Sequence, residues 1–524
     1  MTTNKDKYSI DNTDYTVGQD NIQKWGFDVH NPVFGISASL ISLFLVAILI
    51  VDPATSKAAL DGVKNTIINS FDGLFMWSAN IFVLFCITMI ISPFGKVRLG
   101  GTQAKADYSL LSWIAMLFAA GMGIGLMFWG VAEPAAYFTG WFETPLNVTP
   151  NTPEAAKLAL GATMFHWGLH PWAIYGVVSL SLAFFAYNKG LPLSMRSVFY
   201  PILGDRTWGW PGHIIDILAV LATLFGLATS LGLGAQQAAS GFHHVFGFDN
   251  GLMLQIGIIF VITLVAVVSV MRGIDGGVKI ISNINMLLAL ALVVFVALVS
   301  FAVAMGTIPT TIMGYLENII PLSNPIGRED QAWMHGWTVF YWAWWISWSP
   351  FVGMFIARIS RGRTIREFMI AVLIVPTLVT IVWMSVFGGV AIDQIVNKVG
   401  TLGSQGLTEV PLAMFQMFDA LPMGSILSLI AIILVLVFFV TSSDSGSLVI
   451  DSITSGGKVD APVPQRVFWA FIEGAIAAGL VWVGGTQAIE ALQAGAISTA
   501  LPFTLILLVM CLSLIMGLRT EPRR

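Results

Sequence analysis

The chain has 524 residues, of which 56% are hydrophobic and only 10% are charged, and its mean hydropathy is +0.81. So little charge excludes a soluble fold and predicts an all-α polytopic membrane protein embedded in a lipid bilayer. The formal net charge is −4, and we expect no nucleic-acid partner. Cys86 and Cys511 both fall in apolar segments, so we expect neither a disulfide nor a metal site.

Twelve apolar segments are long enough to cross a bilayer. They lie near 33–51, 73–94, 110–136, 158–187, 214–242, 251–271, 280–305, 333–357, 368–390, 424–443, 467–484 and 495–517. With the polar segment 1–32 placed inside, the cytoplasmic side holds 20 of the 25 Lys and Arg residues and the outside holds five. The excess of positive charge inside predicts two cytoplasmic termini, with 518–524 as a short cytoplasmic tail.

The third segment contains the run Gly121-Met122-Gly123-Ile124-Gly125, with a glycine at every second position. Each glycine destabilises a helix by about 1 kcal/mol relative to alanine. Unwound backbone survives in a membrane only where it is packed in protein or lines a cavity. The run therefore predicts an interrupted helix beside a substrate site, and close helix packing is the alternative explanation for the same glycines.

The fourth segment carries His166 and His170, which have the spacing of two metal ligands on a helix. The residue after the first histidine is Trp167 instead of the glutamate of a zinc hydrolase, and no third ligand suggests itself. We therefore expect hydrogen-bonded, neutral histidines and no transition metal.

The outside segment Thr307–Leu322 has too few apolar residues to cross a bilayer and too many for a free loop. We expect an amphipathic helix that lies along the membrane surface, with an ordered loop as the alternative.

The eighth segment holds the densest aromatic cluster, with five tryptophans in residues 337–348 and four arginines between Arg358 and Arg366. Residues three and four apart share one face of a helix, so these rings form an aromatic face. Such a face within a membrane is typical of a site for a cation that cannot donate hydrogen bonds. The run Ser347–Pro350 predicts a second helix interruption, and paired interruptions in two halves indicate a transporter's substrate site.

The tenth segment ends in Thr441-Ser442-Ser443-Asp444. Hydroxyl and carbonyl oxygens at membrane depth are the ligands that a small alkali cation prefers, although the same run would also form an ordinary polar helix end. Asp444 is either a functional carboxylate or a residue that anchors the helix end.

Several runs of this sequence together resemble the betaine–carnitine–choline transporter family. They are residues 121–134, 162–175, 228–237 and 337–366. The resemblance covers nearly the whole chain, and it implies a homotrimer in the bacterial inner membrane. It also implies twelve transmembrane helices, ten of which form an inverted five-helix repeat of the sodium-symporter (LeuT-like) type. The implied divisions are two extra helices in 33–94, a first repeat in 95–305, an outside helix and loop in 306–332, and a second repeat in 333–517.

The resemblance implies a substrate with a trimethylammonium or related onium group. Its aromatic box would comprise Trp167, Trp172, Tyr175 and Trp345, with Phe340 and Trp348 along the exit path. The backbone around Met122, Gly123 and Gly125 would meet the substrate carboxylate, helped by the dipole of the half-helix.

The resemblance also implies sodium as the coupling ion. One sodium site would use the carbonyls of Ala119 and Met122 together with Phe438, Thr441 and Ser442. A second site would use Thr223 and Phe351, but Leu227 stands where that site needs another threonine. Proton-coupled choline carriers of the family have an aspartate where this chain has Gly125, which favours a zwitterionic substrate and sodium.

We therefore expect a secondary transporter that imports glycine betaine or a similar osmolyte with sodium by alternating access, without a cofactor. The alternatives within the family are proton-coupled choline uptake and sodium-independent exchange of carnitine or betaine. A channel would need an open polar pathway, and an enzyme would need a nucleophile–base pair or a His/Cys/Asp cluster; neither pattern is present in the sequence.

Overall fold

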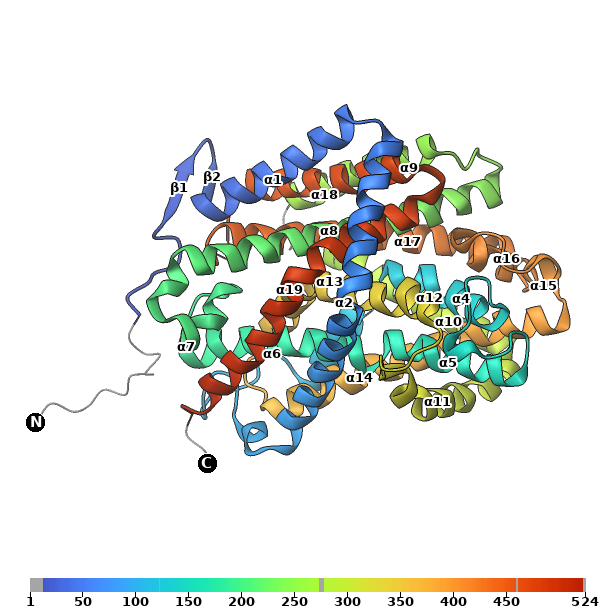
Figure 1. Ribbon diagram of the computed structural model, residues 1–524, viewed down its shortest axis with the longest axis horizontal. Helices are drawn as coiled ribbons and strands as arrows, with labels where there is room; N and C mark the ends of the chain where they lie inside the picture. Colours follow the sequence, from blue (N-terminus) through green and yellow to red (C-terminus); the bar gives the residue numbers. More distant parts are fainter. Residues whose placement is uncertain (1–12, 122, 273–277, 459, 522–524) are drawn as a thin grey trace, which may run out of the picture.

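The computed structural model describes residues 13–121, 123–272, 278–458 and 460–521. They form a bundle of helices with one small antiparallel hairpin, in which β1 (Asn21–Lys24) pairs with β2 (Phe27–His30) (Figure 1). The hairpin and the end of the last helix lie at one end of the molecule, and α15 and α16 lie at the opposite end.

The helices follow the apolar segments of the sequence. Those of the first half are α1 (Asn31–Ile50), α2 (Pro53–Ile91), α3 (Leu110–Gly121), α4 (Ile124–Thr139), α5 (Pro153–Trp167), α6 (Leu169–Lys189), α7 (Tyr200–Leu203), α8 (Trp210–Phe246), α9 (Leu252–Arg272) and α10 (Val278–Val299). Those of the second half are α11 (Phe301–Ser323), α12 (Gln331–Trp333), α13 (Phe340–Arg358), α14 (Ile365–Asn397), α15 (Gly400–Gln405), α16 (Ala413–Asp419), α17 (Gly424–Thr454), α18 (Val463–Gly484) and α19 (Ala488–Leu518).

Large apolar side chains cover the outer faces of α9 and α10. Phe260 on α9 is 60% exposed, and Leu287 and Leu298 on α10 are each 66% exposed. Such surfaces are costly in water and ordinary in lipid, where the outer face of a helix must be apolar. The protein is therefore an all-α polytopic membrane protein, as predicted.

Within the described residues, nine helical stretches are long and apolar enough to span a membrane. Two of these stretches each contain two successive long helices, α5 with α6 and α18 with α19. The predicted third and eighth segments are also helical, in α3–α4 and in α12–α13, but they are not among the nine. The count of twelve crossings thus stays a prediction.

The predicted interruption in the glycine run is present. Helix α3 ends at Gly121 and α4 begins at Ile124, with Gly123 in an extended conformation between them. Met122 lies outside the described residues.

The predicted interruption at Ser347–Pro350 is wrong. Helix α13 runs continuously through Pro350 to Arg358. A proline removes one backbone donor, but the Ser349 hydroxyl donates to the Ile346 carbonyl at 2.7 Å and replaces the missing bond. The irregular part of this segment comes earlier, where residues Met334–Val339 form a turn of π-helix.

A break that the sequence analysis missed separates α5 from α6 at Gly168, within the fourth segment. Pro171 explains it, because a proline cannot donate to the carbonyl four residues earlier and its ring clashes with that carbonyl. A Cβ on residue 168 would lie 2.6 Å from the Met164 carbonyl oxygen and 2.8 Å from the Tyr315 hydroxyl. The Tyr315 hydroxyl also accepts a hydrogen bond from the Leu169 backbone N–H at 2.9 Å. The break is thus closed by a side chain from α11.

Helix α11 contains the predicted amphipathic segment Thr307–Leu322 and begins six residues earlier, at Phe301. It packs along α5 and α14. Its helical character is confirmed, and its position on the membrane surface stays a prediction.

The N-terminal segment is held against the bundle by buried polar contacts, which the sequence analysis did not foresee. Arg196 is wholly buried, forms an ion pair with Asp216 at 3.2 Å and donates to the Tyr15 hydroxyl at 2.9 Å. The hairpin also contacts the loop after α17, because Asn21 donates to the Ser455 carbonyl. These contacts fix residues that would otherwise be a free polar tail.

We expect Tyr315→Phe to destabilise the protein, because the Leu169 N–H would be left unpaired in the interior. The cost is about 1–3 kcal/mol in the free energy of unfolding. The midpoint of thermal unfolding in detergent should fall by several degrees, whereas Tyr108→Phe at an exposed position should leave it unchanged. An unchanged midpoint for Tyr315→Phe would show that the hydroxyl does not close the break.

Candidate functional site

The two interrupted segments contact each other where Gly125 of α4 packs against Trp167 of α5. A Cβ on Gly125, in the first turn of α4, would lie 2.6 Å from the Trp167 ring and 3.2 Å from the Trp344 ring. Trp167 is the last residue of α5, directly before the break at Gly168. The start of α4 therefore packs against the end of α5 with room for a glycine only.

These helix ends and α13 enclose a cavity of about 50 Å³. Seven of the nine residues predicted to contact the substrate line it: Gly123, Gly125, Trp167, Trp172, Tyr175, Trp345 and Trp348. Of the other two, Met122 lies outside the described residues and Phe340 lines a different cavity. The lining also includes Trp344, which belongs to the predicted aromatic face, and four residues that were not predicted, namely Leu126, Pro171, Ser230 and Thr380.

Three pairs of rings in the cavity stand nearly perpendicular to one another, whereas Trp344 stacks on Trp345. The Trp167 and Trp345 ring centroids are 4.9 Å apart at an angle of 74°, and those of Trp172 and Tyr175 are 5.4 Å apart at 81°. Tyr175 also lies 6.3 Å from Trp345 at 78°. Perpendicular rings present both edges and faces to the space between them, and the faces carry the negative part of the aromatic quadrupole.

Phe340 lines a larger cavity of about 610 Å³, together with Trp129 and Trp337. Trp344 lies between Phe340 and Trp345, because its ring stacks on both, with centroid distances of 5.5 Å to Phe340 and 4.7 Å to Trp345. The Trp344 ring therefore lies between Phe340 and the smaller cavity.

The N–H groups of two box tryptophans are fixed by hydrogen bonds. Trp345 donates from Nε1 to the His166 carbonyl at 2.9 Å, which satisfies one of the free carbonyls at the end of α5. Trp167 donates from Nε1 to a carboxylate oxygen of Glu133 at 2.7 Å. Both indoles are therefore held at their polar edge.

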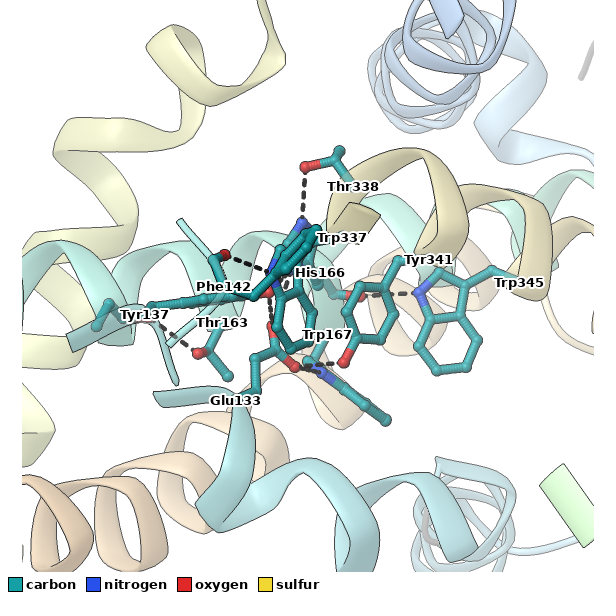
Figure 2. Close-up of polar contacts among 11 residues, drawn as sticks. Glu133, Tyr137, Phe142, Thr163, His166, Trp167, Trp337, Thr338, Tyr341 and Trp345 are labelled. Carbon is teal, nitrogen blue, oxygen red and sulfur yellow. Dashed lines mark hydrogen bonds and ion pairs between the residues drawn. The ribbon is translucent and has the colours of Figure 1, made fainter. Parts of the chain in front are cut away.

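Glu133 is the centre of the polar cluster behind these rings (Figure 2). It lies on α4, wholly buried. Its Oε1 is 2.9 Å from the Tyr137 hydroxyl and 2.8 Å from His166 Nδ1. Its Oε2 accepts hydrogen bonds from Trp167 and, at 2.5 Å, from the Tyr341 hydroxyl. The sequence analysis missed Glu133, although an ionisable residue inside an apolar segment is a candidate for function.

Both histidines of the fourth segment form hydrogen bonds, as predicted. His166 Nε2 is 3.0 Å from the Thr338 hydroxyl, and His170 Nε2 is 3.2 Å from the Asn80 side-chain oxygen. In the part of the chain that the structure describes, no group of three or more His, Cys, Asp and Glu side chains could hold a metal ion.

Four of the five residues of the first predicted sodium site lie on two helices, and the fifth, Met122, is outside the described residues. Phe438, Thr441 and Ser442 are on α17, and Ala119 is on α3. The Thr441 hydroxyl is 3.1 Å from the Val437 carbonyl of its own helix. Helix α17 packs against α4, the second half of the interrupted third segment.

The residues of the second predicted sodium site lie on α8 and α13, which pack together. The Thr223 hydroxyl is buried and donates to the Ala219 carbonyl at 2.7 Å, and Phe351 packs edge-to-face on Trp348. Leu227, one turn after Thr223, points at Gly446 of α17, where a Cβ would lie 2.3 Å from the leucine Cδ1. Leu227 thus fills a packing position between α8 and α17.

The sequence model of the betaine/carnitine/choline (BCCT) family of transporters matches residues 32–523. The chain belongs to this family. It is similar to glycine betaine transporter 1 of Vibrio parahaemolyticus, with 76% identity over 521 residues that cover 99% of this chain and 100% of that protein. A glycine betaine/proline/choline/ectoine transporter of the same organism is 65% identical over 98% of this chain and 92% of that protein.

A more distant BCCT relative, a glycine betaine transporter of Bacillus subtilis, is 41% identical over 92% of this chain and 94% of that protein. Because BCCT proteins are transporters, the chain is a membrane transporter and not an enzyme.

We expect Gly125→Ala to destabilise the protein, since its methyl group would overlap the Trp167 ring. Overpacking of this kind costs about 1–3 kcal/mol. Thermal unfolding in detergent should show the loss, and Gly73→Ala on α2, where a Cβ meets nothing within 4 Å, is the matched control. The cost of Gly125→Ala should shrink when Trp167 is also replaced by phenylalanine. An equal cost in both backgrounds would contradict the contact.

Proposed function

We propose that this BCCT protein imports a quaternary-ammonium osmolyte of the glycine betaine type, coupled to sodium, by alternating access. The observation that carries the proposal is the cavity at the two helix breaks, lined by Trp167, Trp172, Tyr175 and Trp345. The names of the relatives at 76% and 41% identity, both glycine betaine transporters, support it.

The chemistry of a trimethylammonium group suits this cavity. The group carries a positive charge but has no N–H to donate, so aromatic faces replace its hydration at about 0.5–2 kcal/mol for each contact. The substrate carboxylate would meet the backbone at the start of α4, where Gly123 and Gly125 line the same cavity. The first N–H groups of a helix have no partner within the helix, and its dipole favours a negative charge there.

Sodium coupling is the second part of the proposal. Thr441 and Ser442 would supply hydroxyl oxygens, and α3 would supply the carbonyl of Ala119. The carbonyl of Met122 is the other proposed ligand, and Met122 lies outside the described residues. Sodium bound between α3 and α17 would hold the interrupted helix in the form that completes the substrate site. Thr223 and Phe351 remain candidates for a second site, which Leu227 leaves without one hydroxyl.

Gly125 supports sodium over protons. The Cβ of any side chain at position 125 would overlap the Trp167 ring, so an aspartate could not be placed at this position without moving that ring. Choline and proline stay possible cargo, since the relative at 65% identity is named for glycine betaine, proline, choline and ectoine.

The topology that we propose has twelve crossings, with an inverted five-helix repeat after two extra helices and both termini in the cytoplasm of a bacterial cell. The position of the hairpin and the end of α19 at one end of the molecule supports an even number of crossings (Figure 1). We propose a homotrimer in the inner membrane as its assembly.

We expect Trp345→Ala to weaken the binding of glycine betaine by up to about thirtyfold, which corresponds to one desolvated cation–π contact of about 2 kcal/mol. Calorimetry on the purified protein measures the affinity. Trp482→Ala, at a half-exposed position on α18, is the control and should bind normally. Unchanged affinity in both Trp345→Ala and Trp172→Ala would refute the aromatic box.

The double variant Thr441→Ala, Ser442→Ala should raise the sodium concentration that gives half-maximal uptake into proteoliposomes. It should also weaken apparent substrate affinity, because two ligands that stabilise one conformation are reciprocally coupled. The matched control is Ser498→Ala, Thr499→Ala, which removes neighbouring hydroxyls from α19. Uptake that needs no sodium and follows the proton gradient would refute sodium coupling and direct attention to Asp444.

A further inference from the structure

Glu133 is wholly buried, and each of its carboxylate oxygens contacts two neighbouring groups that can donate a hydrogen bond. Its two oxygens have four partners: the hydroxyls of Tyr137 and Tyr341, the Trp167 indole N–H and His166 Nδ1. Four is also the number of lone pairs that an ionised carboxylate offers. The indole N–H can only donate, and each of the other three groups can donate as well. An ionised Glu133 therefore accepts from all four donors. The Tyr137 hydroxyl also lies 3.1 Å from His166 Nδ1, and its oxygen can accept from that N–H while its own proton is donated to Glu133.

In the described part of the chain, no lysine or arginine forms an ion pair with this negative charge. Among the described residues, the only basic side chain within ion-pair distance of Glu133 is His166, whose Nε2 is bonded to the Thr338 hydroxyl. A neutral imidazole fits this pair of contacts, with Nδ1–H donating to the carboxylate and Nε2 accepting from the hydroxyl. The cluster of Figure 2 then carries a net charge of about −1, stabilised by hydrogen bonds from neutral donors.

Trp167 lies between the charged carboxylate and the substrate cavity and contacts both. The indole donates to Glu133 at its nitrogen edge, and its ring lines the cavity. An anion bonded to the N–H draws positive charge to that edge and makes the ring face more negative, which strengthens the attraction for a cation. A buried charge also acts directly across a medium of low dielectric constant.

We infer that Glu133 is a positioning and specificity-determining residue, which holds Trp167 in place and makes the cavity select a cationic onium head over a neutral group of the same shape. The inference rests on the proposed function, since it concerns the same cavity.

The test compares two ligands of matched shape. Glycine betaine and 3,3-dimethylbutanoate differ by one atom, because a carbon replaces the quaternary nitrogen and removes the positive charge. In Glu133→Gln, the side chain keeps its size, loses its charge and has an NH2 donor in place of one acceptor oxygen. Glycine betaine should bind about tenfold more weakly to this variant, whereas 3,3-dimethylbutanoate should bind equally well or more tightly. Calorimetry or displacement of labelled glycine betaine measures both affinities.

The control variants separate charge from packing. Tyr137→Phe removes one hydrogen bond from the same carboxylate and leaves its charge, so the ratio of the two affinities should stay that of the wild type. Glu133→Asp also keeps the charge and should keep the ratio, even where both affinities fall. Should Glu133→Gln fail to fold, Trp167→Phe cuts the link at the indole nitrogen and should reduce the ratio in the same direction.

The inference would be overturned if Glu133→Gln lost affinity for both ligands equally, because Glu133 would then be a purely structural residue. The same outcome in Trp167→Phe would overturn it if that variant has to replace Glu133→Gln. So would an unchanged affinity for glycine betaine. Wild-type protein that binds no glycine betaine would instead overturn the proposed function itself, and the inference with it.

Discussion

Every backbone N–H and C=O group within a membrane needs a partner inside the protein, and this constraint accounts for where the helices break. The chain interrupts two neighbouring segments, at Gly123 and at Gly168. At the second break, the Tyr315 hydroxyl accepts from the free N–H of Leu169, and the Trp345 indole donates to the free carbonyl of His166. One of the groups that closes the break is therefore itself a wall of the cavity, so helix ends and aromatic box form one unit.

The same constraint explains why the glycine run predicted a helix break correctly and the prolines did not. The glycine run at 121–125 predicted its break correctly, because glycines at every second position weaken any helix. Pro350 predicted a break that is absent, since Ser349 supplies the bond that the proline cannot. Pro171 causes a break that was not predicted, next to Gly168. The presence of a proline alone therefore does not predict a break, since α14 and α19 also run through Pro376 and Pro502.

The class of the protein and most of the cavity lining could be predicted from the sequence. Hydropathy gives the helices, and the aromatic residues at 167, 172, 175, 345 and 348 line one cavity. Phe340 shares the helical face of Trp344 but lines a separate cavity, because Trp344 stacks between it and Trp345. The role of Glu133 could not be predicted, since its four partners come from α4, α5 and α13 and are brought together only by the packing of these helices. Helical spacing describes one face of one helix, whereas this cluster is formed by three.

The arrangement of Glu133 also bears on how a cavity can attract a cation and still release it. A carboxylate in direct contact with an onium group would form a buried ion pair, whose separation is costly. Here an indole ring stands between the carboxylate and the cavity, and four donors already satisfy the charge. The ring transmits part of the electrostatic attraction, and no direct ion pair between the carboxylate and the cargo has to be separated when the cargo leaves. A transporter needs a site that is selective and weak enough to empty, and a charge held behind an aromatic ring meets both needs.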